Sequence, residues 1–121
     1  MTAPAPNIIL VNCDDLGYGD LGCYGNTFVQ SPNIDSLAAG GARLDNCFSQ
    51  HPMCTPSRAS FLSGRYPHTT RCRRNGQDIP ADETLVTRIL ADNGYTCGLS
   101  GKLHLSACNP KATGRLTEPR I

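Results

Sequence analysis

Proline and glycine divide this chain into short segments, and their spacing limits the length of every element that can form. The sequence holds nine prolines and twelve glycines among 121 residues. Proline is tolerated in the first turn of a helix, and glycine favours the position just after its end. The spacing therefore predicts short helices and short strands joined by loops.

Three helices are expected from these signals. One begins at Pro32 with Ser31 as its N-cap, and it stops at the glycines of residues 40–41. A second is predicted over residues 56–63, where a glycine follows, and a third over residues 85–92. The apolar residues expected on the inner face of the first helix are Ile34, Leu37 and Ala38.

Short runs rich in β-branched and apolar residues predict three strands, over residues 7–13, 42–49 and 95–100. Strands that alternate with helices indicate an α/β fold with a mostly parallel sheet flanked by helices. Ligands bind such sheets outside the carboxyl ends of the strands. Chemically active side chains follow all three expected strands: Asp14, Asp15, Cys54, Lys102 and His104.

Length and charge narrow the class of protein. A chain of 121 residues predicts one small domain, and its net charge of +1 favours neither nucleic acid nor an anionic membrane as a partner. Because it shows neither a membrane-spanning run nor a signal peptide, a cytoplasmic location is expected. The seven cysteines are then interpreted as reduced thiols, and no CxxC spacing supports a zinc module.

Two adjacent aspartates, Asp14 and Asp15, follow the first expected strand. Their carboxylates repel each other unless a cation offsets the charge, and hard oxygen ligands suit Ca²⁺, Mg²⁺ or Mn²⁺. A turn is the alternative, because aspartate favours turns and Leu16-Gly17 follows. Both interpretations stay open on these residues alone.

Cys54 precedes the second expected helix, and Arg58 lies one turn along it. A helix N-terminus stabilises a thiolate, and its orphan N–H groups attract anions. A nucleophile, an anion site and a guanidinium within one turn suit a tetrahedral oxyanion such as sulfate or phosphate. The alternative is a buried structural cysteine.

Lys102 and His104 alternate about Leu103, so in an extended backbone both would point to the same side. Such a pair could neutralise a transferring anion and supply a general acid. The alternative is two polar surface residues on a loop. His51 and His68, each beside a proline, are interpreted as ordinary loop histidines.

Residues 54–58 (CTPSR), followed by residues 62–65 (LSGR), resemble the signature of the sulfatase family, whose core reads C-x-P-S-R. Residues 7–26 resemble the family's opening strand and loop, and residues 31–37 resemble its first helix. Residues 94–105 resemble a segment that ends in G-K-W-H-L, with leucine here in place of the tryptophan. The resemblance implies part of an alkaline-phosphatase/sulfatase-like α/β fold.

The resemblance also implies what the cysteine is for. In sulfatases a maturation enzyme reads C-x-P-x-R and oxidises the cysteine, here Cys54, to formylglycine. One hydroxyl of the hydrated aldehyde attacks the sulfur of a sulfate ester, and the alcohol leaves. The second hydroxyl then loses its proton and expels sulfate as the aldehyde re-forms. A serine would stop at a stable sulfate ester.

The remaining roles follow the matching positions. Asp14 and Asp15 would bind a divalent cation, Ca²⁺ in most of the family, with the hydrate at Cys54 completing part of its shell. Arg58 would hold the hydrate and the carboxylates in register. The resemblance further implies that Lys102 binds a sulfate oxygen and that His104 hydrogen-bonds the hydrate.

Sulfatases run to several hundred residues, and their later metal pair, histidine and lysine have no counterpart after His104. Residues 1–121 are therefore interpreted as the N-terminal part of a sulfatase catalytic domain, with 106–121 as an irregular tail and little activity expected alone. One alternative is a phosphonate or phosphate ester hydrolase on the same scaffold. Another is a non-catalytic fragment that binds a metal or a partner.

Overall fold

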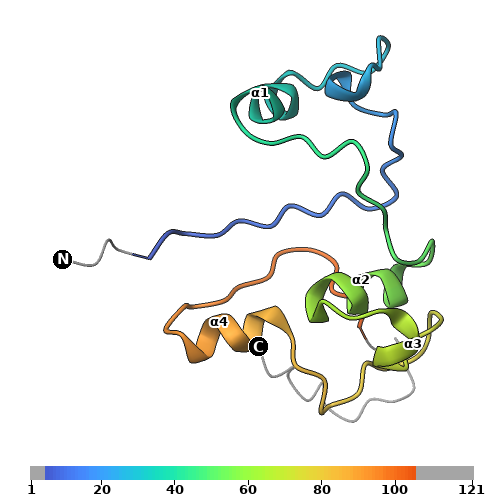
Figure 1. Ribbon diagram of the computed structural model, residues 1–121, viewed down its shortest axis with the longest axis vertical. Coiled ribbons are helices and arrows are strands. Elements are labelled where there is room, and N and C mark those ends of the chain that lie inside the picture. Colours follow the sequence, from blue (N-terminus) through green and yellow to red (C-terminus); the bar gives the residue numbers. More distant parts are fainter. Residues whose placement is uncertain (1–4, 106–121) are drawn as a thin grey trace. The chain divides into compact units, whose positions relative to one another are not determined.

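The computed structural model describes residues 5–105, and the chain divides into two compact units, Met1–Asn46 and Cys47–Ile121. The predicted irregular tail, residues 106–121, lies outside the described residues. The first unit holds the short 3-10 helix η1 and the helix α1, and the second holds α2, α3 and α4 (Figure 1). Their bounds are Gly22–Tyr24 for η1, Pro32–Gly40 for α1, Cys54–Ser63 for α2, Pro67–Thr70 for α3 and Val86–Asp92 for α4.

The prediction of a parallel sheet is wrong, because no residue in the described range 5–105 belongs to a β-strand. Residues 7–13, expected to be the first strand, form an extended segment (Figure 1). Their side chains are exposed to solvent, with Ile9 86% and Val11 78% exposed. A strand is stable only when neighbouring strands satisfy its backbone N–H and C=O groups. Without that ladder the β-branched pattern gives extended coil, and the described part of the chain is helical rather than α/β.

The helix predictions are closer to the structure. Proline and glycine delimit α1 as expected, and α4 begins one residue later than predicted. The helix α2 begins at Cys54, two residues before the predicted start at Pro56. Pro56 is tolerated in this first turn, because the N–H groups of a first turn have no partner within the helix and proline has no N–H. It ends where Gly64 adopts a left-handed φ of 69° and donates its N–H to the Ser60 carbonyl at 2.8 Å. The short helix α3 was not predicted.

Hydrogen bonds, rather than buried apolar side chains, hold α1 to η1 in the first unit. The prediction that α1 buries an apolar inner face is wrong, since Leu37 is 74% exposed and no residue of the helix is buried. Ser31 occupies the N-cap position, but its hydroxyl makes no capping bond and instead donates to Asp35 Oδ1 at 3.0 Å. That hydroxyl accepts the Gly22 N–H at 2.8 Å, and Asp35 Oδ1 accepts the Cys23 N–H at 2.7 Å.

The second unit contains a small core. Ala59 and Cys72 are fully buried, and Leu105 is 6% exposed. The buried residues of α2 are mostly small or polar, which lets the α3 segment approach the helix closely. Burial raises the pKa of the Cys72 thiol, and the negative charge of Asp78 adds to this effect. The partly buried side chains that pack on this core are Leu62, Ile79, Leu85 and Leu103.

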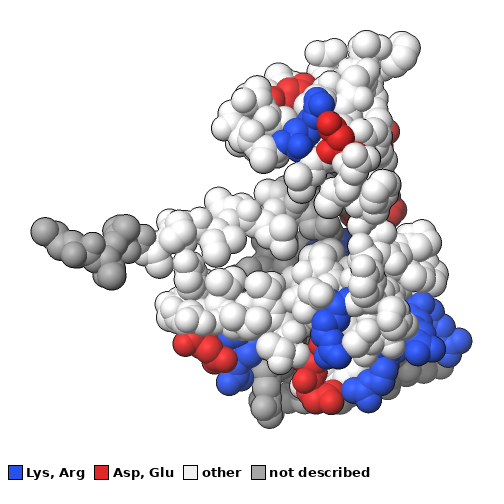
Figure 2. Space-filling model, in the orientation of Figure 1, with Lys and Arg blue, Asp and Glu red and all other residues white. Residues whose placement is uncertain are grey.

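Several charged side chains of the second unit form ion pairs. Basic and acidic groups lie beside one another on its visible face (Figure 2). Arg65 donates to Glu83 at 2.9 Å, and Arg71, in the basic run of residues 71–74, donates to Asp82 at 3.1 Å. Among the described residues, no helix has the length and apolar character that crossing a bilayer requires.

Candidate functional site

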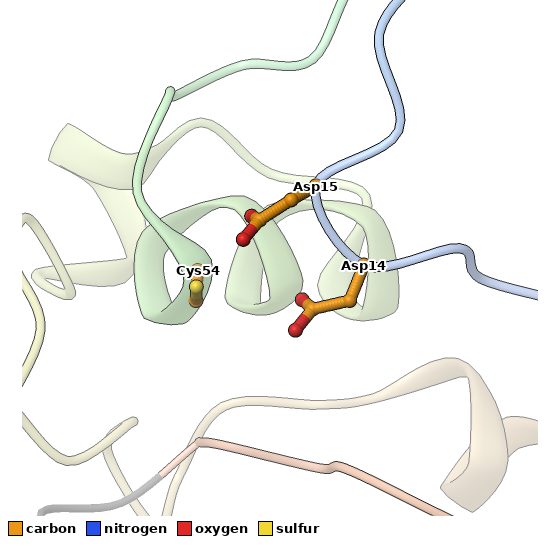
Figure 3. A group of neighbouring side chains, drawn as sticks. All are labelled: Asp14, Asp15 and Cys54. Carbon is orange, nitrogen blue, oxygen red and sulfur yellow. The ribbon is translucent and has the colours of Figure 1, made fainter. Parts of the chain in front are cut away.

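The N-terminus of α2 fixes the position of Cys54. Met53 is the N-cap residue, with an extended φ of −93° and ψ of 150°, and Cys54 is the first helical residue (Figure 3). Its thiol is a free one and is half-buried. The backbone therefore changes direction immediately before the cysteine, which sits at the positive end of the helix dipole.

Lys102 reaches this cysteine from a distant part of the sequence. Its Nζ lies 3.5 Å from the Sγ of Cys54, although the two residues are 48 positions apart. This positive charge lies beside the side chain of Cys54, where it would attract an anionic group. The structure thus brings together two residues that the sequence placed after different expected strands.

Arg58 links the helix to the segment that carries Lys102. The residue is only 7% exposed, and its Nη1 donates to the Lys102 carbonyl oxygen at 2.6 Å. The other end of that segment is held by the Ile79 N–H, which donates to the Leu105 carbonyl at 2.9 Å. Residues 102–105 are therefore fixed at both ends, and a buried guanidinium sets the position of the Lys102 backbone.

His104 lies in the same fixed segment but in an unusual conformation. Its φ is 54°, in the left-handed region, so the extended backbone on which the alternation of residues 102 and 104 rested is absent here. Within residues 5–105, its Nδ1 atom is buried and has no hydrogen-bond partner. A buried polar atom that has no hydrogen-bond partner is energetically costly.

Asp14 and Asp15 lie in the first unit, on a tight turn. Asp15 has a left-handed φ of 56°, a conformation that aspartate adopts more readily than most residues. The two carboxylates project to the same side of the turn (Figure 3) and offer oxygens within 4.8 Å of each other. The turn and the metal interpretations are thus compatible, because this turn presents two exposed hard oxygen ligands of the kind that Ca²⁺ binds.

A residue that the sequence interpretation missed contacts the first turn of α2. The side chain of Asn75 accepts the Thr55 N–H through its Oδ1 atom at 2.8 Å. This N–H is therefore not among the free donors that the sequence predicted at the helix start. Gly76, with a φ of 80°, marks a turn in the sequence, but no sequence signal places that turn beside Thr55.

Comparison with known proteins identifies the kind of chain to which these residues belong. The model of the sulfatase family matches residues 6–115. Human steryl-sulfatase is 46% identical over 121 residues, covering 90% of this chain, and human arylsulfatase A is 46% identical over 110 residues, covering 85%. Human arylsulfatase D is 45% identical over 115 residues, covering 82%. The chain spans 21%, 22% and 18% of the length of these three relatives.

Proposed function

The chain belongs to the sulfatase family, and we propose that it carries part of the site of a sulfuric ester hydrolase whose nucleophile is a formylglycine made from Cys54. The contact between Lys102 Nζ and Cys54 Sγ at 3.5 Å carries this proposal most directly. The Lys102 ammonium therefore lies beside the proposed nucleophile. The steryl and aryl sulfates named in the relatives suggest a sulfate ester of a hydrophobic alcohol as the substrate class.

In the proposed reaction, an oxygen of the hydrated aldehyde at position 54 forms a bond to the sulfur of the ester. The bond between the sulfur and the alcohol oxygen breaks, and the alcohol leaves with a proton. The second hydroxyl then loses its proton, and the bond between the Cβ of residue 54 and the sulfate oxygen breaks. Sulfate departs and the aldehyde re-forms, so each turnover consumes one water.

Three side chains of the second unit have roles in this scheme. Lys102 binds a sulfate oxygen and offsets the charge that develops on it. His104 uses its buried ring nitrogen to hydrogen-bond the hydrate. Arg58 keeps Lys102 in place through its bond to the Lys102 carbonyl. Each role needs only the local geometry of residues 54–58 and 102–105.

Asp14 and Asp15 are the proposed ligands of a divalent cation, with Ca²⁺ first and Mg²⁺ or Mn²⁺ as alternatives. Two adjacent carboxylates on one turn fit a hard cation, because each needs positive charge to offset the other. When bound, such a cation would polarise the oxygens of the sulfuryl group. Retention of Ca²⁺ by the chain after gel filtration, and its loss in D14N/D15N, would test these ligands separately from turnover.

Tandem mass spectrometry of the tryptic peptide Leu44–Arg58 tests the central proposal. The chain is expressed in its native host or beside a formylglycine-generating maturation enzyme, which is its proposed partner. We expect the Cys54 thiol to be replaced by an aldehyde that an aminooxy probe captures. The peptide also contains Cys47, which must remain a thiol and which serves as an internal control.

The outcome separates the proposal from its alternatives. An unmodified thiol at Cys54 in the presence of the maturation enzyme would contradict a formylglycine nucleophile and favour a non-catalytic role. If the aldehyde forms, rates on an aryl sulfate and on an aryl phosphonate ester distinguish the two substrate classes. The isolated chain is expected to show little turnover. We also propose that the protein is cytoplasmic, and cell fractionation tests that location.

A further inference from the structure

A surface asparagine reaches the turn of α2 that carries the nucleophile. Asn75 lies 20 residues beyond Thr55 in the sequence, and its Oδ1 accepts the Thr55 N–H at 2.8 Å. Thr55 is fully buried, whereas Asn75 itself is exposed. The bond thus ties a buried backbone donor, directly after Cys54, to a side chain that contributes little to the core.

The loop that carries Asn75 is braced by its own hydrogen bonds. Gln77 accepts the N–H groups of Arg73 and Arg74 through its Oε1, at 2.7 and 3.1 Å. Cys72 anchors the start of the loop in the core, where it is fully buried. Asn75 is therefore presented by a fixed loop, so its bond can restrain the helix start instead of moving with it.

We propose that Asn75 is a positioning residue for the nucleophile at position 54, an inference whose catalytic meaning rests on the proposed function. By accepting the Thr55 N–H, Asn75 holds the first turn of α2 in the position from which Cys54 meets Lys102. The same bond occupies a backbone donor that a helix N-terminus would otherwise offer to an anion. At this turn, side chains such as that of Lys102 therefore bind the sulfate, and the Thr55 N–H does not.

Site-resolved alkylation of the unmodified thiol tests this inference. The chain is expressed without a maturation enzyme and treated with iodoacetamide, and peptide Leu44–Arg58 reports the rates at Cys54 and Cys47 separately. Because Cys54 is half-buried and Cys47 is exposed, loosening the first turn should accelerate reaction at Cys54 alone. We expect Asn75→Ala to raise the ratio of the Cys54 rate to the Cys47 rate by about three- to tenfold, since one hydrogen bond is lost.

Two further variants make the result specific. Asn75→Asp keeps an oxygen that accepts the Thr55 N–H, so its ratio should stay within about twofold of the unsubstituted chain. Asn93→Ala is the matched control, because the exposed Asn93 side chain also makes one bond of 2.8 Å, to the Ile89 carbonyl on α4. Its ratio should not change, even if it lowers stability as much as Asn75→Ala does.

The inference is overturned if Asn75→Ala leaves the ratio within about twofold, or if Asn93→Ala raises it equally. If Asn75→Ala does not fold, Asn75→Ser, whose shorter side chain cannot reach the same position, carries the same expectation and the same overturning result. Because the assay uses the free thiol and requires no turnover, its outcome is independent of whether formylglycine forms. Failure of the proposed function and failure of this inference are therefore distinguishable.

Discussion

The helices α1 and α2 carry similar sequence signals but have different surroundings. Both have a proline in the first turn and a glycine beyond the last, yet no residue of α1 is buried, whereas five residues of α2 are. The first unit is joined by polar bonds at Ser31 and Asp35, and the second packs around Ala59 and Cys72. The difference shows that a proline in the first turn and a glycine after the last residue are compatible with a helix but do not determine whether the helix has a packing partner.

The largest expected effect comes from the buried guanidinium of the second unit. Arg58→Met should lower the free energy of unfolding of residues 47–105 by about 3 kcal/mol, because it removes a charged donor and leaves the Lys102 carbonyl without its Arg58 bond. Arg88→Met, which removes an exposed ion pair with Asp92, should cost about 0.5 kcal/mol or less. Chemical denaturation measures both, and equal losses would contradict the claim that burial decides the difference.

The contrast between the helices can be tested with one substitution placed in each. Ala59→Leu should destabilise the second unit by about 2 kcal/mol, because Ala59 is fully buried and extra methylene groups must displace its neighbours. Ala39→Leu in α1 should change stability by about 0.5 kcal/mol or less, because Ala39 is exposed. If hydrogen exchange showed the same effect in both helices, the distinction between a packed and an unpacked helix would fail.

The polar bonds of the first unit predict a smaller loss. Asp35→Ala removes the carboxylate that accepts the Cys23 N–H and the Ser31 hydroxyl, and it should weaken the contact between η1 and α1 by about 1 kcal/mol. Faster hydrogen exchange at the Cys23 amide is the expected readout. Ser36→Ala, which removes an exposed bond to the Asn33 carbonyl on the same helix, should leave that amide unchanged.

The smallest effect concerns pH and the core of the second unit. Burial raises the pKa of Cys72 in the folded chain, so above the ordinary thiol pKa of about 8.5 the unfolded chain loses its proton first. The contribution of Cys72 to stability is therefore full below that pH and declines as pH rises toward the folded pKa. In Cys72→Ala the decline in unfolding free energy between about pH 8 and 10 should be shallower, whereas Cys47→Ala should keep the slope of the unsubstituted chain.

Much of the candidate site could be predicted from the sequence because its signals are local. The order of cysteine, proline and arginine in residues 54–58 places the proposed nucleophile and the guanidinium on one turn, and the structure begins a helix at Cys54. The segments that carry Cys54 and Lys102 were expected to converge at one edge of a sheet, and the two side chains are in contact. The contact exists without the sheet, since Arg58 and Ile79 hold the Lys102 segment instead.

Asn75 could not be found from the sequence, because a surface asparagine before a glycine looks like any turn. The positive φ of His104 was also hidden, since the motif alone suggests extended backbone.

The sequence by itself determined the family and the residues at which α1, α2 and α4 end, because each depends on residues that are neighbours in the chain. Only the tertiary structure decided that residues 7–13 form no strand, that α1 lacks a buried face, and that Asn75 accepts the Thr55 N–H of α2. The physical reason is that a helix satisfies its backbone hydrogen bonds within itself, whereas a strand, a buried face and a distant hydrogen bond each need a partner from elsewhere.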